Sequence, residues 1–551
     1  MADSLVKNFR KHFEAIKVDR ADWEPGWRDI AKGFSPVRSR FSITETNKNN
    51  QSRLNTPLNN CGSRVRRVFR AGLTNGTCSP ARPWFRLGLA DMDQANKSRP
   101  VREYLEALER IFLEIYRSSN FYRAIPMTLD DCGTFGTSCV IPTEDFDNVM
   151  HFTPVVTGQF WLNTGDNGKV NAMFRQFTLN SKAAMQKFSG KVSNRALMAY
   201  NNSDYTTKFE FVHCICENPD AKNNAIYGRD KSYKSVYFEP SDTEDTLNRE
   251  SGYDIFPVMA PRWEPTGEDT YGYGCGAVAL GDNNQLQLQE RRKAQAIDKM
   301  VSPPLQAPTK MKDQPIAGIA GGITFADPDV QGRQAINPLY TVDPRLAELR
   351  EDMAAVEARI EDAFYYNLFL MLANDTRSNI TATEIAQRQE EKLVMLGPAM
   401  ESVHNELFDP IISATLYYAD KAGILPPAPK ELQGKAIKVE YISTIAQAQK
   451  MVGIATVERF VGFIGNLSQF FPAVRHKVDP FATVDQVGDM LGIRSGIIRG
   501  TDEAQRDAAS EAQQAQAAQM MQMGLAGTQA AKQLSEAKTA RGSVLDTLAG
   551  V

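Results

Sequence analysis

The feature that most constrains the fold is a long Gln-rich helix that follows directly on a Gly-rich turn. Residues 256–260 (FPVMA) predict a buried strand, and four glycines follow between positions 267 and 276. Glycines let the backbone turn sharply and let a neighbouring element come close. The helix predicted over 276–300 has too few apolar residues to lie in the core of a monomer. We therefore expect a compact body that continues into a helix whose packing partners are copies of the same chain.

The composition excludes several protein classes. With 551 residues the chain has material for about three or four ordinary domains, and 42% hydrophobic residues suffice for a core. A net charge of −3 gives no sign of general nucleic-acid binding. The seven cysteines lack the spacing of a disulfide framework and indicate reduced thiols. Without a secretory leader or an apolar run of about 20 residues, we expect a soluble protein of a reducing compartment, with no membrane partner.

Charge is distributed unevenly along the chain. Residues 1–70 contain 15 Lys and Arg against 7 Asp and Glu, a surplus of +8. Residues 343–393 contain 6 Lys and Arg against 11 Asp and Glu, a deficit of −5. Two interpretations stay open: these are solvated helix faces, or they are complementary faces that meet between copies of the chain.

A long helix is predicted over 343–372. Asp343 is a suitable N-cap and Pro344 fits the first helical position, so the helix would extend about 45 Å at 1.5 Å per residue. Apolar residues recur along it every three or four positions and predict a packing seam. The seam residues are Leu346, Leu349, Met353, Val356 and Ile360. Because no segment of the same chain is expected to cover this seam, it predicts a closed homo-oligomer with a heterologous interface.

A polar segment separates this helix from the next. It consists of Asn374, Asp375, Thr376, Arg377, Ser378 and Asn379. Thr381 and Glu384 then have the spacing of a capping box and begin a further helix. Pro398 and Pro410 lie inside its apolar pattern, so we expect a kink or a break near each.

Residues 120–262 have the pattern of an α+β unit. In KFEFVHCICE (208–217), apolar and aromatic residues alternate with period two, which predicts a half-buried strand. One face would carry Phe209, Phe211, His213 and Ile215, and the other would carry Val212, Cys214 and Cys216.

Two further segments have distinctive compositions. Residues 301–342 are rich in Pro and Gly and are too long for an ordinary connection, so they predict a small β-containing insert between two helices. Residues 501–551 are rich in Ala, Gln and Met, which favour a helix but offer little apolar bulk. This tail is either a helix packed in a symmetric bundle or a frayed end.

No enzymatic site can be assigned. The chain lacks a phosphate-binding P-loop, and Gly272, Gly274 and Gly276 do not have the spacing of a dinucleotide fingerprint. His213 and Cys214 invite a zinc interpretation, but no second Cys pair lies at finger spacing, so buried structural cysteines are favoured. We assign no catalytic residue, no cofactor-binding residue, no metal ligand and no cofactor.

Two phrases of the sequence resemble one known protein family. They are ARPWFRL at 81–87 and the stretch PVMAPRW…GEDTYG at 257–272, which leads into the Gln-rich helix. A helix–insert–helix over 280–372 and the polar break before Thr381 follow in the same order. In these features the chain is similar to the head-to-tail connector (portal) proteins of short-tailed, T7-like podovirus bacteriophages.

The resemblance implies a mixed, mainly α, portal fold. Its wing would be an α+β unit formed by residues 1–275. Residues 380–500 would add a long wing helix and a helical region that follows it. The stem helices would be 276–300 and 343–372, with a clip at 301–342 between them. The residues 373–379 would form a loop that narrows the tunnel, and 501–551 an Ala- and Gln-rich helical crown or barrel.

The resemblance also implies a function and partners. The protein would form a ring of commonly twelve copies at one vertex of the virion capsid, after assembly in the host cytoplasm. It would conduct double-stranded DNA without sequence preference during packaging and ejection. Partners would be the major capsid protein, scaffolding protein, terminase and tail adaptor. Because tight phosphate neutralisation would hold the duplex, an acidic segment such as 343–393 suits a sliding conduit. The alternative is another structural phage protein, an internal core or tail-tube component.

Overall fold

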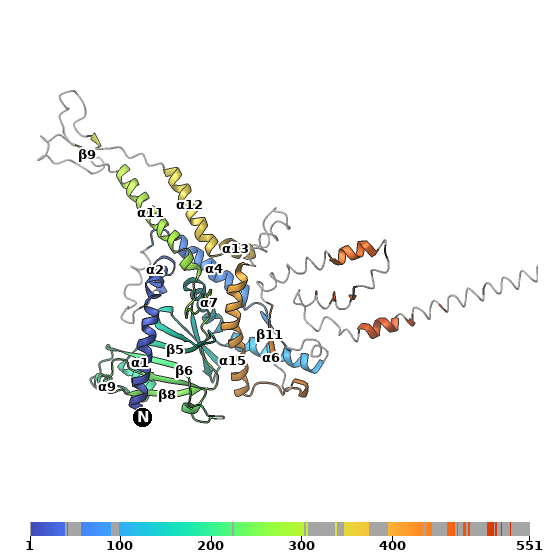
Figure 1. The fold of residues 1–551 in the computed structure, drawn as a ribbon, viewed down its shortest axis with the longest axis horizontal. Helices are drawn as coiled ribbons and strands as arrows, with labels where there is room; N and C mark the ends of the chain where they lie inside the picture. Colours follow the sequence, from blue (N-terminus) through green and yellow to red (C-terminus); the bar gives the residue numbers. More distant parts are fainter. Residues whose placement is uncertain are drawn as a thin grey trace, which may run out of the picture. The chain divides into compact units, whose positions relative to one another are not determined.

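The protein was analysed as a computed structural model, in which helices predominate and sheets are small (Figure 1). The chain divides into two compact units, one of residues 1–90 with 100–445 and one of 91–99 with 446–551. In the second unit, residues 460–468 and 504–511 are helical. The structure describes residues 2–38, 41, 57–89, 99–222, 225–301, 305–306, 337–338, 346–373, 395–432, 437–442, 460–468, 471, 478–480, 483–484, 487, 504–511, 513–514, 520 and 529.

A five-stranded antiparallel sheet forms the β part of the first unit, with the strand order β4–β5–β6–β7–β8. Its strands are β4 (Phe160–Thr164), β5 (Val170–Asn180), β6 (Lys208–Glu217), β7 (Tyr233–Phe238) and β8 (Leu247–Tyr253). One face packs against helix α1 (Ala2–Ala21), where the Phe13 ring stacks on Phe174 with centroids 5.4 Å apart. Helices α8 (Ser181–Phe188) and α9 (Asn194–Asn201) pack on the other face.

Strand β6 matches the predicted range, but the prediction that it is half-buried is wrong. Val212 and Cys214 lie in the core beneath α1, while Phe209 and Phe211 lie in the core beneath α8 and α9. Helices on both sides of the sheet therefore bury both faces of its central strand. Alternation of residue types alone does not predict burial of both faces, because cysteine and valine on the second face pack against a helix as well as phenylalanine does.

The first unit contains further helices and three further strand pairs. The helices are α2 (Glu24–Phe34), η1 (Pro36–Arg38), α4 (Cys61–Thr77), α6 (Arg99–Ser118), α7 (Phe121–Phe135), η3 (Thr157–Gln159), η4 (Gly228–Asp230), α10 (Cys275–Val278), α11 (Leu280–Val301), α12 (Leu346–Ala363), α13 (Tyr366–Ala373), η6 (His404–Phe408), α15 (Asp409–Lys421) and η7 (Lys430–Leu432). Three strand pairs join them: β1 (Phe85–Leu89) with β11 (Ile437–Tyr441), β2 (Cys139–Asp145) with β3 (Val149–Val155), and β9 (Leu305–Gln306) with β10 (Asn337–Pro338).

The tryptophan of the Trp84 phrase packs among aromatic rings. Trp84 is 1% exposed, and its ring lies parallel to those of Phe121 and Tyr441, with interplanar angles of 9° and 8°. Because β1 pairs with β11, the same phrase also binds the chain that follows α15. The phrase that contributed to the family resemblance is therefore a packing element.

The helix that contains Pro410 changes its hydrogen bonding where the sequence predicts a disturbance. Residues 395–403 are α-helical, η6 is a π-helical turn, and α15 continues from Asp409 with Pro410 in its first turn. Proline lacks a backbone N–H and clashes with the preceding turn, so a wider turn before it accommodates the ring. The helical backbone continues from 395 to 421 through this turn, so the expected break is not present and the prediction is right only in the position of the irregularity. Pro398 lies in the first described turn, and the residues before 395 lie outside the described part.

Candidate functional site

Helices α11 and α12 form an antiparallel hairpin that runs away from the sheet (Figure 1). Near its base Arg359 Nε donates to Asp282 Oδ1 at 2.8 Å, and farther out Gln289 donates to Asp352. These hydrogen bonds and the ion pair link the two helices along their length. The helix predicted over 276–300 is thus observed as α11, preceded by the short helix α10.

The base of the hairpin is held by the segment that precedes α4. The side-chain oxygen of Gln287 accepts from Leu58 N and Asn59 N at 2.7 and 3.0 Å, and its Nε2 donates to Asn59 O at 2.8 Å. Asn59 Nδ2 in turn donates to Glu357 on α12 at 3.0 Å. One loop therefore binds both helices of the hairpin, so the hairpin cannot pivot at its base without breaking these bonds.

The predicted seam is only partly free. Met353, Val356 and Ile360 are 5%, 0% and 0% exposed, so these residues are buried within the chain. The expectation that no intrachain partner covers the seam is wrong for these three, because α11 and α4 pack on this end of α12. Leu349 is half-buried, and the side chain of Leu346 lies outside the described part.

The predicted continuous helix over 343–372 is interrupted. Tyr365 has φ of +53°, a left-handed conformation, and α13 starts in a new direction after it. Phe364 is fully buried next to Phe34 and Phe69, and the Phe369 ring packs at Gly72 of α4. Aromatic residues before and after the bend are therefore buried in the core. The free energy gained by burying them outweighs the strain of one non-glycine residue at positive φ.

The outer part of the hairpin exposes both apolar and charged residues. On α11, Leu288, Ile297, Met300 and Val301 are 46%, 42%, 47% and 77% exposed. Helix α12 carries six carboxylates and two arginines within its 18 residues. At 100° per residue, Ile297, Met300 and Val301 share one side of α11, whereas Leu288 projects from the opposite side. We call Ile297, Met300 and Val301 the apolar strip of α11, which suits packing against another copy.

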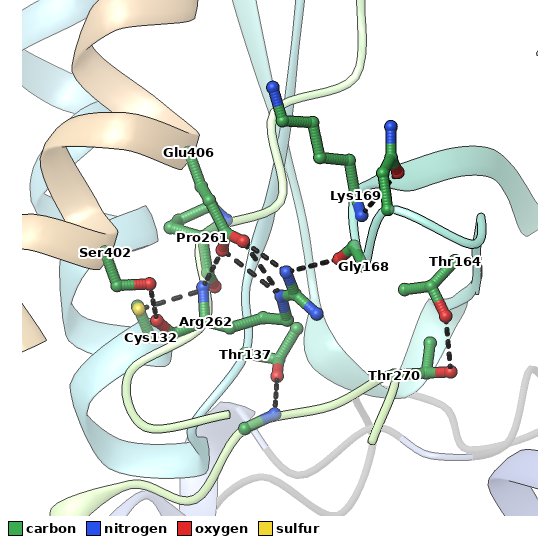
Figure 2. Close-up of polar contacts among 12 residues, drawn as sticks. Cys132, Thr137, Thr164, Gly168, Lys169, Pro261, Arg262, Thr270, Ser402 and Glu406 are labelled. Atoms are coloured by element: carbon green, nitrogen blue, oxygen red, sulfur yellow. Dashed lines mark hydrogen bonds and ion pairs between the residues drawn. The ribbon is translucent and has the colours of Figure 1, made fainter. Parts of the chain in front are cut away.

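Arg262 connects the sheet-bearing part of the unit to the helix that contains η6 (Figure 2). Its backbone N–H donates to Glu406 Oε2 at 2.8 Å, and its guanidinium donates to both oxygens of the same carboxylate. The guanidinium also reaches Gly168 O at 2.8 Å, and Ser402 Oγ donates to Arg262 O at 2.6 Å. We call these four residues the Arg262 cluster.

The glycine run that follows Arg262 serves backbone packing. A Cβ at Gly272 would lie 2.8 Å from Gly136 O, and one at Gly274 would lie 2.6 Å from Gly133 O. Gly272 N also donates to Thr137 Oγ1 at 2.8 Å. The run is therefore required for close contact with the end of α7.

Several buried titratable groups have shifted pKa values. Burial raises the pKa of Glu109 to about 7, although the carboxylate accepts from Leu87 N at 2.8 Å. Burial lowers the pKa of His404 to about 4, and its ring stacks on Tyr441 at 4.0 Å. Burial also raises the pKa of the Cys214 thiol well above its ordinary value. Cys214 lies in the interior, Glu109 and His404 are half-buried, and no hydrogen bond or ion pair joins these three described residues.

The described part of the chain contains no group of three or more His, Cys, Asp or Glu side chains placed to hold a metal ion. Among the described helices, none has the length and apolar content to cross a bilayer.

Several predicted features lie outside the described residues. They are the whole polar loop, Asn374 to Asn379, almost all of 301–342, and most of 501–551. The described part of 301–342 includes one short antiparallel pairing, Asn337 with Gln306 and Pro338 with Leu305. This pairing is consistent with the predicted β-containing insert.

Sequence reasoning missed the Arg262 cluster. Arg262 was noted within its phrase, but Glu406 lies 144 residues away and has no local signal. The one sequence signal near Glu406 is Pro410, four residues later, which predicts an irregular helix but no partner.

The comparisons with known proteins agree over almost the whole chain. The family described as bacteriophage head to tail connecting protein matches residues 6–498. The portal protein of Salmonella phage epsilon15 is 36% identical over 552 residues, covering 100% of this chain and 99% of that protein. The probable portal protein of Bordetella phage BPP-1 is 37% identical over 484 residues, covering 88% of this chain and 87% of that protein. A chain of the virion of a native gene transfer agent particle is similar at a TM-score of 0.33 and 11% identity, covering 79% of this chain and 88% of that chain, too low to support any inference.

Proposed function

The chain belongs to the family of bacteriophage head to tail connecting proteins and functions as a phage portal, and we propose that it does so as a closed ring of copies around a DNA passage. In this proposal the α11–α12 hairpins stand side by side around the passage as a stem. The observation that supports it best is the hairpin, which is cross-linked at its base yet exposes apolar residues on its outer part.

Neighbouring copies would cover the exposed apolar strip of α11. Ile297, Met300 and Val301 are each more than two-fifths exposed, which is unfavourable in a monomer but suits a heterologous contact. With six carboxylates against two arginines, α12 would give the passage a negative lining that does not hold DNA phosphates. In this proposal the ring lies at one capsid vertex and contains twelve copies, the number common in such rings.

Residues 301–342 would form a clip at the far end of the hairpin. This clip would contact terminase during packaging and the tail adaptor afterwards, while the outer body would contact the major capsid and scaffolding proteins. Deletion of residues 305–335 should leave rings that assemble but neither package DNA nor accept tails. Rings that package normally after this deletion would contradict the docking role.

Light scattering of the purified full chain tests the ring. We expect a single species many times the 61.3 kDa of one chain, at a mass that does not change on dilution. Ile297→Gln and Met300→Gln should shift this species toward monomer, whereas Val278→Gln, a more exposed position at the end of α10, should leave it intact. A monomer at all concentrations would contradict the proposal.

A further inference from the structure

We propose that the sheet face next to α8 carries a binding site for a phosphate oxyanion, formed by Arg175, Lys187 and Arg249 around the Tyr237 ring. This site lies in the sheet-bearing part of the first unit and is independent of the hairpin and the Arg262 cluster.

The strand register places four of the residues in one row. Arg175 of β5 is opposite His213 of β6, His213 is opposite Tyr237 of β7, and Tyr237 is opposite Arg249 of β8. Directly paired residues project from the same face of a sheet, so two arginines, a histidine and a tyrosine share one side. This is the side on which α8 and α9 pack.

Lys187 of α8 completes the group. Its Nζ lies 5.1 Å from the centroid of the Tyr237 ring and 4.3 Å from that of Phe177. The guanidinium of Arg175 lies 5.1 Å from the same Phe177 ring. Shared aromatic neighbours therefore bring a lysine and an arginine together on the face that also carries Arg249.

No carboxylate neutralises these cations within the described residues. Arg175, Lys187 and Arg249 form no ion pair there. Glu210 of β6 projects from the opposite face, where it accepts from Gln176 at 3.1 Å. Glu217 shares the face but lies four residues beyond His213, roughly 13 Å along the strand.

The charges act on one another. Burial, and then Arg175 and Arg249, lowers the pKa of Lys187 to about 8. Burial and the same three cations hold the pKa of His213 well below its ordinary value, so this imidazole is neutral. Three unpaired cations in one place repel one another, and a bound anion would relieve this repulsion.

His213 supplies a buried polar atom that lacks a partner. The side chain is 3% exposed, and its Nε2 lies 2.9 Å from Ser235 Oγ, while Nδ1 has no hydrogen-bond partner among the described residues. Its ring stacks on Tyr237 with centroids 3.9 Å apart, so it belongs to the same group. Buried polar atoms without partners are rare in folded proteins and call for a ligand or water.

The chemistry of the group favours phosphate. Two guanidinium groups present planar forks that match pairs of phosphate oxygens, and the ammonium group adds a third positive contact. Free phosphate and the phosphodiester of DNA offer the same oxyanion, so both are candidate sources.

Thermal unfolding of the full-length protein tests the site. The melting temperature is measured at pH 7 in increasing sodium phosphate and in sodium chloride of equal ionic strength, for wild type, Arg249→Gln, Lys187→Gln and Lys182→Gln. Lys182 is the matched control, because it lies on the same helix but over Tyr205 at 5.9 Å. A general salt effect of phosphate would increase linearly and equally in all four proteins.

We expect wild type and Lys182→Gln to gain a saturable increase in melting temperature from phosphate, and the other two variants to lose most of it. Arg249→Gln should be no less stable than wild type in chloride, since it removes a repulsive charge. A short DNA duplex that abolishes the phosphate response identifies the phosphodiester as the source, and an unchanged response identifies free phosphate. A linear response to phosphate that is equal in all four proteins, or an equal response to chloride and phosphate, would overturn the proposal.

Discussion

The carboxylate of Glu406 accepts hydrogen bonds from both the backbone N–H and the guanidinium of Arg262. These bonds join a π-helical turn to the segment that follows the sheet in the chain. The Arg262 side chain is 9% exposed and that of Glu406 is 24% exposed, so the pair is largely shielded from water. Glu406 lies in the helix that follows the polar loop along the chain. The pair therefore provides a direct mechanical connection between that helix and the sheet-bearing part of the unit.

Loss of the Glu406 carboxylate should destabilise the protein. Glu406→Ala leaves the guanidinium and a backbone N–H without their partner, and we expect a loss of about 2–3 kcal/mol in the free energy of unfolding. Glu406→Gln keeps an acceptor for the N–H and should lose about half as much. Chemical denaturation measures both, and Glu401→Gln, an exposed change one turn earlier, should be neutral. Equal stability of Glu406→Ala and wild type would show that the pair contributes nothing.

Val356→Asp should prevent folding of the hairpin base. Val356 is fully buried within one chain, so the change places a carboxylate in an apolar interior at a loss of about 3 kcal/mol or more. The sequence alone predicts a failure of assembly only. Circular dichroism melting distinguishes the two: we expect a lower melting temperature for Val356→Asp and little change for Ala355→Asp, at the exposed neighbouring position. A variant with wild-type melting that stays monomeric would support the interchain seam instead.

Stability should fall between about pH 5 and pH 8 because of Glu109. Burial raises its folded pKa to about 7 from an ordinary 4.5, so the folded state binds the proton more tightly than the unfolded state. This contribution is fully present below pH 4.5 and is lost as the pH rises through 7. Glu109→Gln should reduce the difference in unfolding free energy between pH 5 and pH 8 by about 2 kcal/mol. Glu114→Gln, an exposed change on the same helix, should keep the wild-type pH dependence. An unchanged slope in Glu109→Gln would assign the pH dependence to other groups.

We predict from the sequence that Arg377 is the phosphate contact of the polar loop, a segment outside the described residues. Arg377→Ala should leave ring assembly intact and weaken the retention of packaged DNA, because Arg377 is the one cation in the sequence from 374 to 379. The difference in DNA retention between wild type and Arg377→Ala should become smaller as the salt concentration rises. Salt screens the contact between Arg377 and phosphate in wild type, so less is lost when Arg377 is removed. A DNA-release assay at low and high salt measures this. If retention at low salt is unchanged, Arg377 is an ordinary surface residue.

The local elements could be predicted well from the sequence, because they depend on local patterns. The strand at 208–217 and the helix after the glycine run appear where the pattern places them. The bend at Tyr365 could not be predicted, since it depends on where Phe364 and Phe369 find space in the core. Burial of Val356 was missed for a related reason: the periodicity reveals an apolar seam but not which element covers it.

The residues of both sites are distant in the sequence, so they could not be brought together by prediction from local patterns. Glu406 and Arg262 are 144 residues apart, and nothing in either neighbourhood indicates the partner. The row from Arg175 to Arg249 requires the register of four strands, which a single sequence does not reveal. The glycine run could be recognised as a close-contact segment, but its contact with the end of α7 could be identified only in the fold.

Electron microscopy of the purified full-length protein tests the central claim most directly. We predict rings with a central hole, in which the paired helices α11 and α12 of each copy surround the hole and the five-stranded sheet lies outside them. Monomers, open filaments, or rings in which the hairpin points away from the hole would contradict the assignment of this hairpin to the DNA passage.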